Sequence, residues 1–125
     1  MAVRFPDRKA RTARLRAALP EILARIIDEA TERVILFGST VRGAGGSTSD
    51  LDLLVVRHDQ RPPTERMEDL YRRARSPVAL DLLVYTPREL ELARETSSFV
   101  RRALQDSEVV YERGQAVARA GASRS

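Results

Sequence analysis

Residues 33–57 read RVILFGSTVRGAGGSTSDLDLLVVR, and this stretch predicts two strands joined by a glycine-rich turn. The continuous apolar run at 33–37 is typical of a strand buried on both faces, and it ends at Gly38. Residues 38–49 hold four of the six glycines, so the backbone of this turn can approach a ligand closely. Residues 50–57 form the second predicted strand.

The second strand carries two carboxylates. Asp50 and Asp52 are one residue apart, so alternation puts them on one face of the strand together with Leu54 and Val56. Burying two like charges side by side is unfavourable unless a cation neutralises them. Carboxylate oxygens select Mg²⁺ or Mn²⁺, ions that also bind substrate phosphates. The structural interpretation is that Asp50 caps the strand and Asp52 faces solvent.

A third carboxylate lies on a later strand. Residues 78–85 are apolar except for Asp81, and a central strand does not hold a carboxylate without a partner. If this strand lies beside the second, Asp50, Asp52 and Asp81 converge at one end of the sheet, next to the glycine-rich turn. Such a site suits two metal ions that activate a hydroxyl and stabilise a transferred phosphate. The structural alternative is a salt bridge from Asp81 to an arginine.

Helices are predicted around these strands. Near 3.6-residue spacing of apolar positions predicts a basic N-terminal helix over about 7–30, which either kinks at Pro20 or restarts there. Thr64 is expected to cap the next helix, and Thr86 with Glu89 predicts a capping box. The last elements are a helix with Phe99, Val100, Ala103 and Leu104 on one face and an edge strand at 109–111.

Composition sets the class of protein. The chain has 125 residues, 42% of them apolar, which predicts one domain over residues 1–113 followed by a disordered tail at 114–125. We expect a cytoplasmic protein without contact to membranes, because no apolar stretch is long enough for a membrane span and no signal peptide is evident. Without cysteine, disulfides and cysteine-ligated metals are excluded.

Positive charge is concentrated near the N-terminus. Residues 1–25 hold seven basic and two acidic side chains, and all basic residues except Lys9 are arginines, which can bind carboxylate or phosphate through two hydrogen bonds. The arm is either a solvated helix face or a phosphate-binding surface. Three Tyr, three Phe and no Trp are too few for the stacking platforms of single-strand-binding proteins, so nucleic acid is not an expected partner.

The order of these motifs matches a known family. Residues 37–43 (FGSTVRG), residues 49–55 (SDLDLLV) and the later Asp81 together resemble the DNA polymerase beta-like nucleotidyltransferase superfamily. Within it the chain is similar to the minimal nucleotidyltransferases of prokaryotes, the MNT or MntA-like group, over about residues 20–112. The resemblance implies an α/β (α+β) nucleotidyltransferase fold, a mixed sheet of three to four strands flanked by helices.

The resemblance also implies a reaction. Family members transfer a nucleoside monophosphate, here expected to be AMP from ATP, to a hydroxyl group and release pyrophosphate. The implied site residues are Gly38, Ser39 and Arg42 for the phosphates of the nucleotide, and Asp50, Asp52 and Asp81 as ligands of two Mg²⁺ ions, with Mn²⁺ as a substitute.

The resemblance finally implies a partner. Similar small chains are paired with a helical HEPN protein as toxin and antitoxin, and the nucleotidyltransferase can adenylylate a hydroxyl of that partner. We therefore expect an ATP-dependent antitoxin acting on a HEPN-type toxin. One alternative is a non-catalytic antitoxin that neutralises its partner by contact alone. Another is transfer to a small molecule of the aminoglycoside type, for which the chain would build its acceptor pocket as a homo-oligomer.

Overall fold

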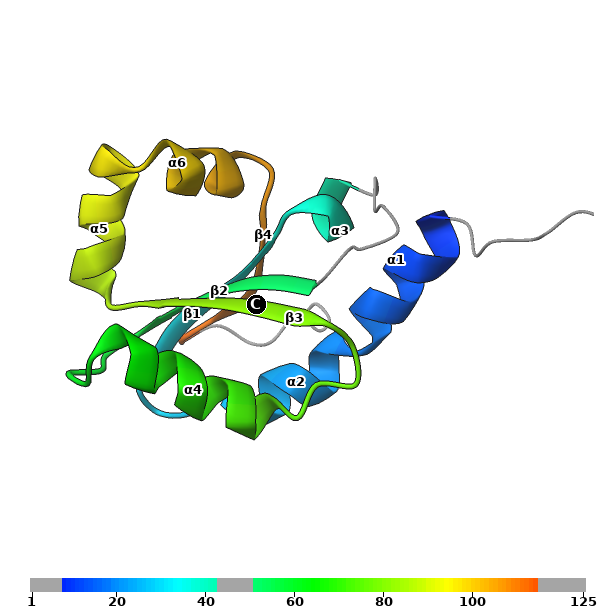
Figure 1. The fold of residues 1–125 in the computed structure, drawn as a ribbon, viewed down its shortest axis with the longest axis horizontal. Coiled ribbons are helices and arrows are strands. Elements are labelled where there is room, and N and C mark those ends of the chain that lie inside the picture. Colours follow the sequence, from blue (N-terminus) through cyan, green and yellow to red (C-terminus); the bar gives the residue numbers. More distant parts are fainter. Residues whose placement is uncertain (1–7, 43–50, 115–125) are drawn as a thin grey trace, which may run out of the picture.

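A computed structural model of the chain describes residues 8–42 and 51–114 (Figure 1). Its centre is a mixed four-stranded sheet in the order β3-β2-β1-β4. The strands are β1 (Thr31–Phe37), β2 (Leu51–Arg57), β3 (Leu80–Tyr85) and β4 (Glu108–Glu112). The helices are α1 (Arg8–Ala17), α2 (Leu19–Ile26), α3 (Ser39–Arg42), α4 (Pro63–Ala74), α5 (Pro87–Thr96) and α6 (Ser98–Gln105). The predicted mixed sheet of three to four strands flanked by helices is confirmed.

Strand direction differs across the sheet. β1 is antiparallel to both of its neighbours, β2 and β4, whereas β2 and β3 are parallel and are connected through α4. A parallel pair requires such a crossover, because the chain must return to the same end of the sheet before the next strand begins. The first residues of β2 and β3 therefore lie beside the last residues of β1, at one end of the strands.

Helices cover both faces of the sheet, with α2 and α4 on one face and α5 and α6 on the other (Figure 1). Leu51 and Leu53 of β2 pack in the core on the α2 and α4 side, whereas Leu54 and Val56 pack in the core on the α5 and α6 side. The predicted alternation along β2 is thus confirmed for the described residues. It also puts Asp52 on the face covered by α5 and α6.

Three helix starts show how local sequence acts. α1 ends before Pro20, which lies in the first turn of α2, so the N-terminal helix restarts rather than kinks. The expectation that Thr64 caps α4 is wrong: Pro62 is the N-cap, and Pro63 takes the first helical position, where its missing N–H is not needed. The capping box of α5 is confirmed. The Thr86 hydroxyl accepts from the Glu89 N–H, and the Glu89 carboxylate accepts from the Thr86 N–H.

The two ends of the chain were also covered by predictions. The predicted edge strand at 109–111 is present as β4, which pairs with β1. Gly114 is described, whereas the rest of the expected tail, 115–125, lies outside the described residues. Arg16 of the basic arm pairs with Glu108 of β4 at 2.8 Å, so one of its charges is used within the fold. No helix within 8–42 or 51–114 is long and apolar enough to cross a membrane.

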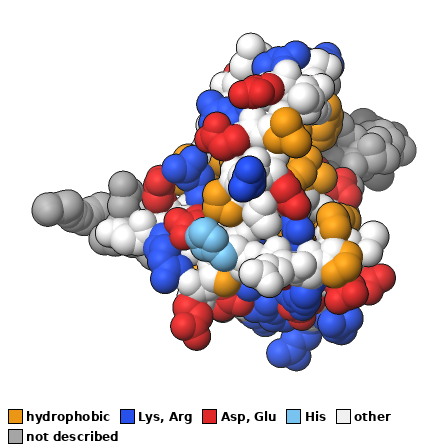
Figure 2. Space-filling view, turned by 90° about the vertical axis from the view of Figure 1, so that its left-hand side faces the viewer, with side chains coloured by type: hydrophobic (Ala, Val, Ile, Leu, Met, Phe, Trp, Pro, Cys, Tyr) orange, Lys and Arg blue, Asp and Glu red, His pale blue; other side chains and the backbone are white. Residues whose placement is uncertain are grey.

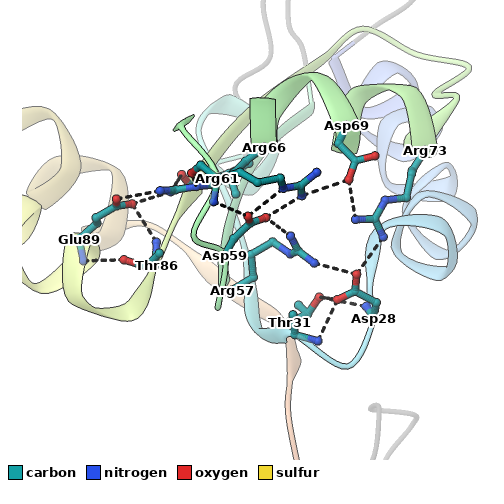
Figure 3. Close-up of polar contacts among 12 residues, drawn as sticks. Asp28, Thr31, Arg57, Asp59, Arg61, Arg66, Asp69, Arg73, Thr86 and Glu89 are labelled. Atoms are coloured by element: carbon teal, nitrogen blue, oxygen red, sulfur yellow. Dashed lines mark hydrogen bonds and ion pairs between the residues drawn. The ribbon is translucent and has the colours of Figure 1, made fainter. Parts of the chain in front are cut away.

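Arginines and carboxylates alternate on the surface shown in Figure 2. Their densest grouping, here called the ion cluster, joins the start of β1, the end of β2 and α4 (Figure 3). Its members are Asp28, Arg57, Asp59, Arg61, Asp69 and Arg73. Arg57 is buried at the end of β2 and donates to both Asp28 and Asp59, so burial of its charge is compensated by two carboxylates.

A second arginine connects the two faces of the sheet. Arg66 of α4 is buried and binds Glu89 of α5 through two hydrogen bonds of 2.7 and 3.0 Å. Its Nε donates to the carbonyl of Arg61 at 2.7 Å. Because the same Glu89 carboxylate completes the capping box with Thr86, one ion pair fixes α4, the start of α5 and the end of β3 relative to each other (Figure 3).

The ion cluster makes folding stability depend on pH. Hydrogen bonds from Arg61, supported by the charge of Arg57, lower the pKa of Asp59 well below its usual value. Burial raises the pKa of Asp28, but hydrogen bonds from Arg57 and Arg73 outweigh it and leave that pKa lowered as well. A carboxylate whose pKa is lowered by folding stabilises the fold above its unfolded pKa, about 4, and loses that contribution as the pH falls further.

We therefore expect the free energy of unfolding to decrease as the pH falls from about 5 towards 2. Replacing Asp59 with Asn should lower the free energy of unfolding at pH 7. It should also make that free energy depend less on pH, because the substituted side chain no longer takes up a proton. Urea unfolding followed by circular dichroism at a series of pH values measures both effects.

Glu68→Gln is the matched control, since Glu68 is exposed on α4 and its side chain makes no ion pair or hydrogen bond with another described residue. An Asp59→Asn variant whose pH dependence equals that of Glu68→Gln would show that the cluster does not act as described.

Candidate functional site

The register of the sheet brings two of the predicted carboxylates together. Asp52 of β2 is the partner of Asp81 of β3 in the parallel pair, so their side chains lie on the same face of the sheet. Asp52 is also the partner of Phe37, the last residue of β1. A row of three positions therefore crosses β1, β2 and β3 at one end of the sheet. Asp50 lies outside the described residues.

Gly38 follows this row directly. Its φ of +83° is a backbone conformation that residues with a Cβ rarely adopt. A Cβ at this position would also overlap the carboxylate oxygen Oδ2 of Asp52. Glycine at the end of β1 is therefore favoured by the turn, and a Cβ there would force the Asp52 carboxylate to move.

The two carboxylates and Gly38 open onto one pocket of about 760 Å³. Its lining combines strand ends with the side chains of α4 and α6, and consists of Phe37, Gly38, Asp52, Met67, Tyr71, Asp81, Leu82, Leu83, Phe99, Arg102, Ala103, Gln105 and Asp106. The volume lies within the range of small-molecule binding sites, about 300 to 1,000 Å³. Asp52 is half-buried in this pocket and Asp81 is exposed to it.

The position of Asp81 corrects one expectation. Its strand was expected to be central, but β3 is an edge strand of the sheet, and Asp81 near its start is exposed in the pocket. The strand is nevertheless apolar because helices cover both of its faces. No described arginine pairs with Asp81, so the alternative of a salt bridge is not seen among the described side chains.

Ser39 and Arg42, the other predicted phosphate contacts, are the first and last residues of α3. Their side chains lie outside what the structure describes, so their contact with phosphate stays a prediction. The turn before them is held by a hydrogen bond of 3.2 Å from the Val41 N–H to the carbonyl of Gly38. The backbone thus places α3 directly beside the pocket residue Gly38.

Helix α6 contributes pocket residues that the sequence did not reveal. Arg102, Gln105 and Asp106 line the pocket from α6 and its C-terminal end. Phe99 was expected to share one helix face with Val100, Ala103 and Leu104, but it is 55% exposed, whereas Val100 is buried. Its ring meets Phe37 edge to face at 6.4 Å between ring centroids. The sequence did hold one signal for these residues. Arg102 lies three positions after Phe99, so helical spacing puts both on the same face of α6.

Tyr71 of α4 lies at the rim of the pocket, although its helical spacing with Met67, Leu70 and Ala74 is typical of a buried face. It is 37% exposed at the rim of the pocket. Its hydroxyl oxygen accepts a hydrogen bond of 3.0 Å from the N–H of Leu82, on the outer edge of β3. The phenol therefore satisfies a backbone donor that no further strand pairs with.

The donor set fits a hard divalent cation. Asp52 and Asp81 offer carboxylate oxygens on one face, and the Asp52 carboxylate lies against the backbone of Gly38. The parts of the chain that are described contain no group of three or more potential metal ligands. Two carboxylates are enough for Mg²⁺, which typically completes its coordination with water and substrate phosphates.

Comparison with known proteins adds independent findings. The sequence matches the nucleotidyltransferase domain family over residues 16–117. No curated protein is significantly similar in sequence to the chain. A solved structure from Sulfolobus solfataricus, provisionally named a nucleotidyltransferase, has a TM-score of 0.66 and 21% identity, covering 94% of this chain and 98% of that one. A toxin–antitoxin structure with AMP-PNP has a TM-score of 0.49 and 20% identity, covering 78% and 73%.

The close contact at Gly38 predicts a specific mutational effect. Gly38→Ala should destabilise the fold by more than about 2 kcal/mol, because it adds both backbone strain and an overlap with Asp52. Gly114→Ala is the matched control: its φ is +84°, but nothing lies within 4 Å of a Cβ there, so a loss of about 1 kcal/mol is expected. Denaturant unfolding of both variants measures the difference. Equal losses would contradict the contact between Gly38 and Asp52.

Proposed function

The chain belongs to the nucleotidyltransferase domain family, and from this we propose that it is a metal-dependent enzyme that transfers AMP from ATP to a hydroxyl group of a partner protein. The observation that supports this most is the row across the sheet, in which Asp52 and Asp81 are register partners next to Gly38 and share one pocket. Two carboxylates side by side on one face of a sheet are suited to binding a cation.

The transfer has a simple balance of bonds. The acceptor oxygen bonds to the α-phosphorus of ATP, and the bond between the α-phosphorus and the oxygen of pyrophosphate breaks. The proton of the acceptor hydroxyl passes to solvent, and pyrophosphate leaves. Asp52 and Asp81 would hold Mg²⁺, together with Asp50, and this ion would supply charge neutralisation on the phosphates and a lowered pKa of the attacking hydroxyl. Gly38 would let the backbone at the end of β1 approach the nucleotide, and it leaves room for the Asp52 carboxylate that lies against it.

The partner in this proposal is a HEPN-type helical protein, and the chain acts as its antitoxin. The support is the resemblance of the FGSTVRG and SDLDLLV segments to minimal nucleotidyltransferases, together with the open pocket. Every described element belongs to the one sheet and its covering helices. In this proposal the partner supplies the acceptor hydroxyl, which enters the open pocket.

Label transfer tests the reaction. The chain is incubated with Mg²⁺, a HEPN-type partner and ATP labelled at the α- or the γ-phosphate. Label should move to the partner from the α-position only, since γ-label would leave with pyrophosphate. Asp52→Asn and Asp81→Asn should each reduce the rate by about 100-fold or more, because each removes a charge that stabilises the transition state. EDTA should abolish transfer.

Glu68→Gln serves as the control, because Glu68 is an exposed carboxylate outside the pocket lining. Its rate should equal that of the unmodified chain. Neutralisation of the partner without any label transfer would replace the enzyme by an antitoxin that acts through contact alone. Transfer that persists in both aspartate variants would place the reaction at another site.

A further inference from the structure

Arg102 is distinguished by its surroundings. It lines the pocket from α6, and its guanidinium makes no ion pair or hydrogen bond with any described residue. The buried arginines behave differently, since Arg57 and Arg66 are each bound to carboxylates. Its neighbour Arg101 points elsewhere and donates to two backbone carbonyls, those of residues 94 and 95. Arg102 is thus a cation with open hydrogen-bond donors inside the candidate site.

The charge of the pocket explains what such a cation is suited to bind. Asp52, Asp81 and Asp106 give the described lining three carboxylates, and Arg102 is the only basic side chain among them. A polyphosphate entering this pocket would be repelled by the carboxylates wherever no cation intervenes. A guanidinium can bind two phosphate oxygens at once through its planar pair of N–H groups. The α6 side of the pocket is therefore the favourable side for a phosphate chain.

Phe99 lies one helical turn before Arg102 on the same side of α6. Its ring is 55% exposed in the pocket lining, although burying a phenylalanine normally stabilises a fold. The ring is held in place by Phe37, with 83° between the two ring planes. An exposed aromatic ring that is fixed against a strand end offers a stacking surface to a planar base.

We propose that α6 is the nucleotide-binding wall of the pocket, with Arg102 binding the phosphate chain of a nucleoside triphosphate and Phe99 stacking on its base. This inference rests on the proposed function, because the triphosphate is the substrate of that reaction. It adds α6 to the recognition of the nucleotide, beside the predicted phosphate contacts of Gly38, Ser39 and Arg42, while β2 and β3 carry the carboxylates. The two contacts are separable, since one recognises phosphate and the other recognises the base.

Calorimetric titration in Mg²⁺ with two probes, ATP and inorganic tripolyphosphate, separates these contacts. Arg102→Gln should lower the affinity for both probes by about tenfold or more, because it removes a charge-assisted hydrogen bond to phosphate. Phe99→Leu should lower the affinity for ATP by about five-fold or more and leave the affinity for tripolyphosphate unchanged, because tripolyphosphate has no base. Phe99→Tyr keeps the ring and should restore ATP binding.

Arg101→Gln is the matched control for Arg102, because it removes the same charge from the neighbouring residue, outside the pocket lining. Leu92→Ala is the control for Phe99, since Leu92 is 60% exposed on α5 and outside the pocket. Both controls should bind the two probes as the unmodified chain does. All substituted residues are exposed, so circular dichroism should show unchanged folding.

Each result decides between the two proposals. Equal ATP affinity in Arg102→Gln and Arg101→Gln would overturn the assignment of α6, even if label transfer confirms the reaction. The same holds if Arg102→Gln binds ATP normally but no longer binds the partner, because α6 would then contact protein. ATP binding that depends on Arg102 and Phe99 without label transfer would support α6 and overturn the reaction. An unmodified chain that binds neither probe would overturn both proposals.

Discussion

The site depends on the register between β2 and its two neighbours. Because Asp52 is paired with Phe37 on one side and with Asp81 on the other, the end of β1 and the start of β3 meet at one carboxylate. A shift of one residue would turn Asp52 to the face of α2 and α4 and would bury Leu51 or Leu53 on the wrong side. The same packing that forms the two cores therefore also fixes the pocket.

Charge is used differently in two parts of the molecule. In the ion cluster and at Arg66, arginines and carboxylates satisfy one another and hold α4 and α5 around the edge strand β3. In the pocket, Asp81 and Arg102 face a common space, and neither makes an ion pair with a described residue. Charges matched within the fold stabilise it, whereas charges left for a ligand cost stability and provide binding.

Sequence reasoning predicted the features that follow from local geometry. Alternation placed Asp52 and Leu54 on one face, and the Thr86 segment contained its own capping partners. An apolar run does not reveal whether its strand is central or at an edge, so Asp81 was expected to be buried. The contribution of α6 was missed because Phe99 and Arg102 enter the pocket only through tertiary packing. The overlap at Gly38 depends on strand register, which an isolated sequence does not fix.

The central claim is that Asp52 and Asp81 form one metal-binding nucleotide site. Anomalous diffraction from crystals grown with Mn²⁺ and a non-hydrolysable ATP analogue tests this directly. Manganese scatters anomalously, so its positions are distinguished from those of water and protein atoms. The account predicts a manganese peak within bonding distance, about 2 to 2.4 Å, of oxygens of both Asp52 and Asp81, with the phosphates of the analogue beside it. An ordered analogue whose manganese ions contact neither carboxylate would contradict it.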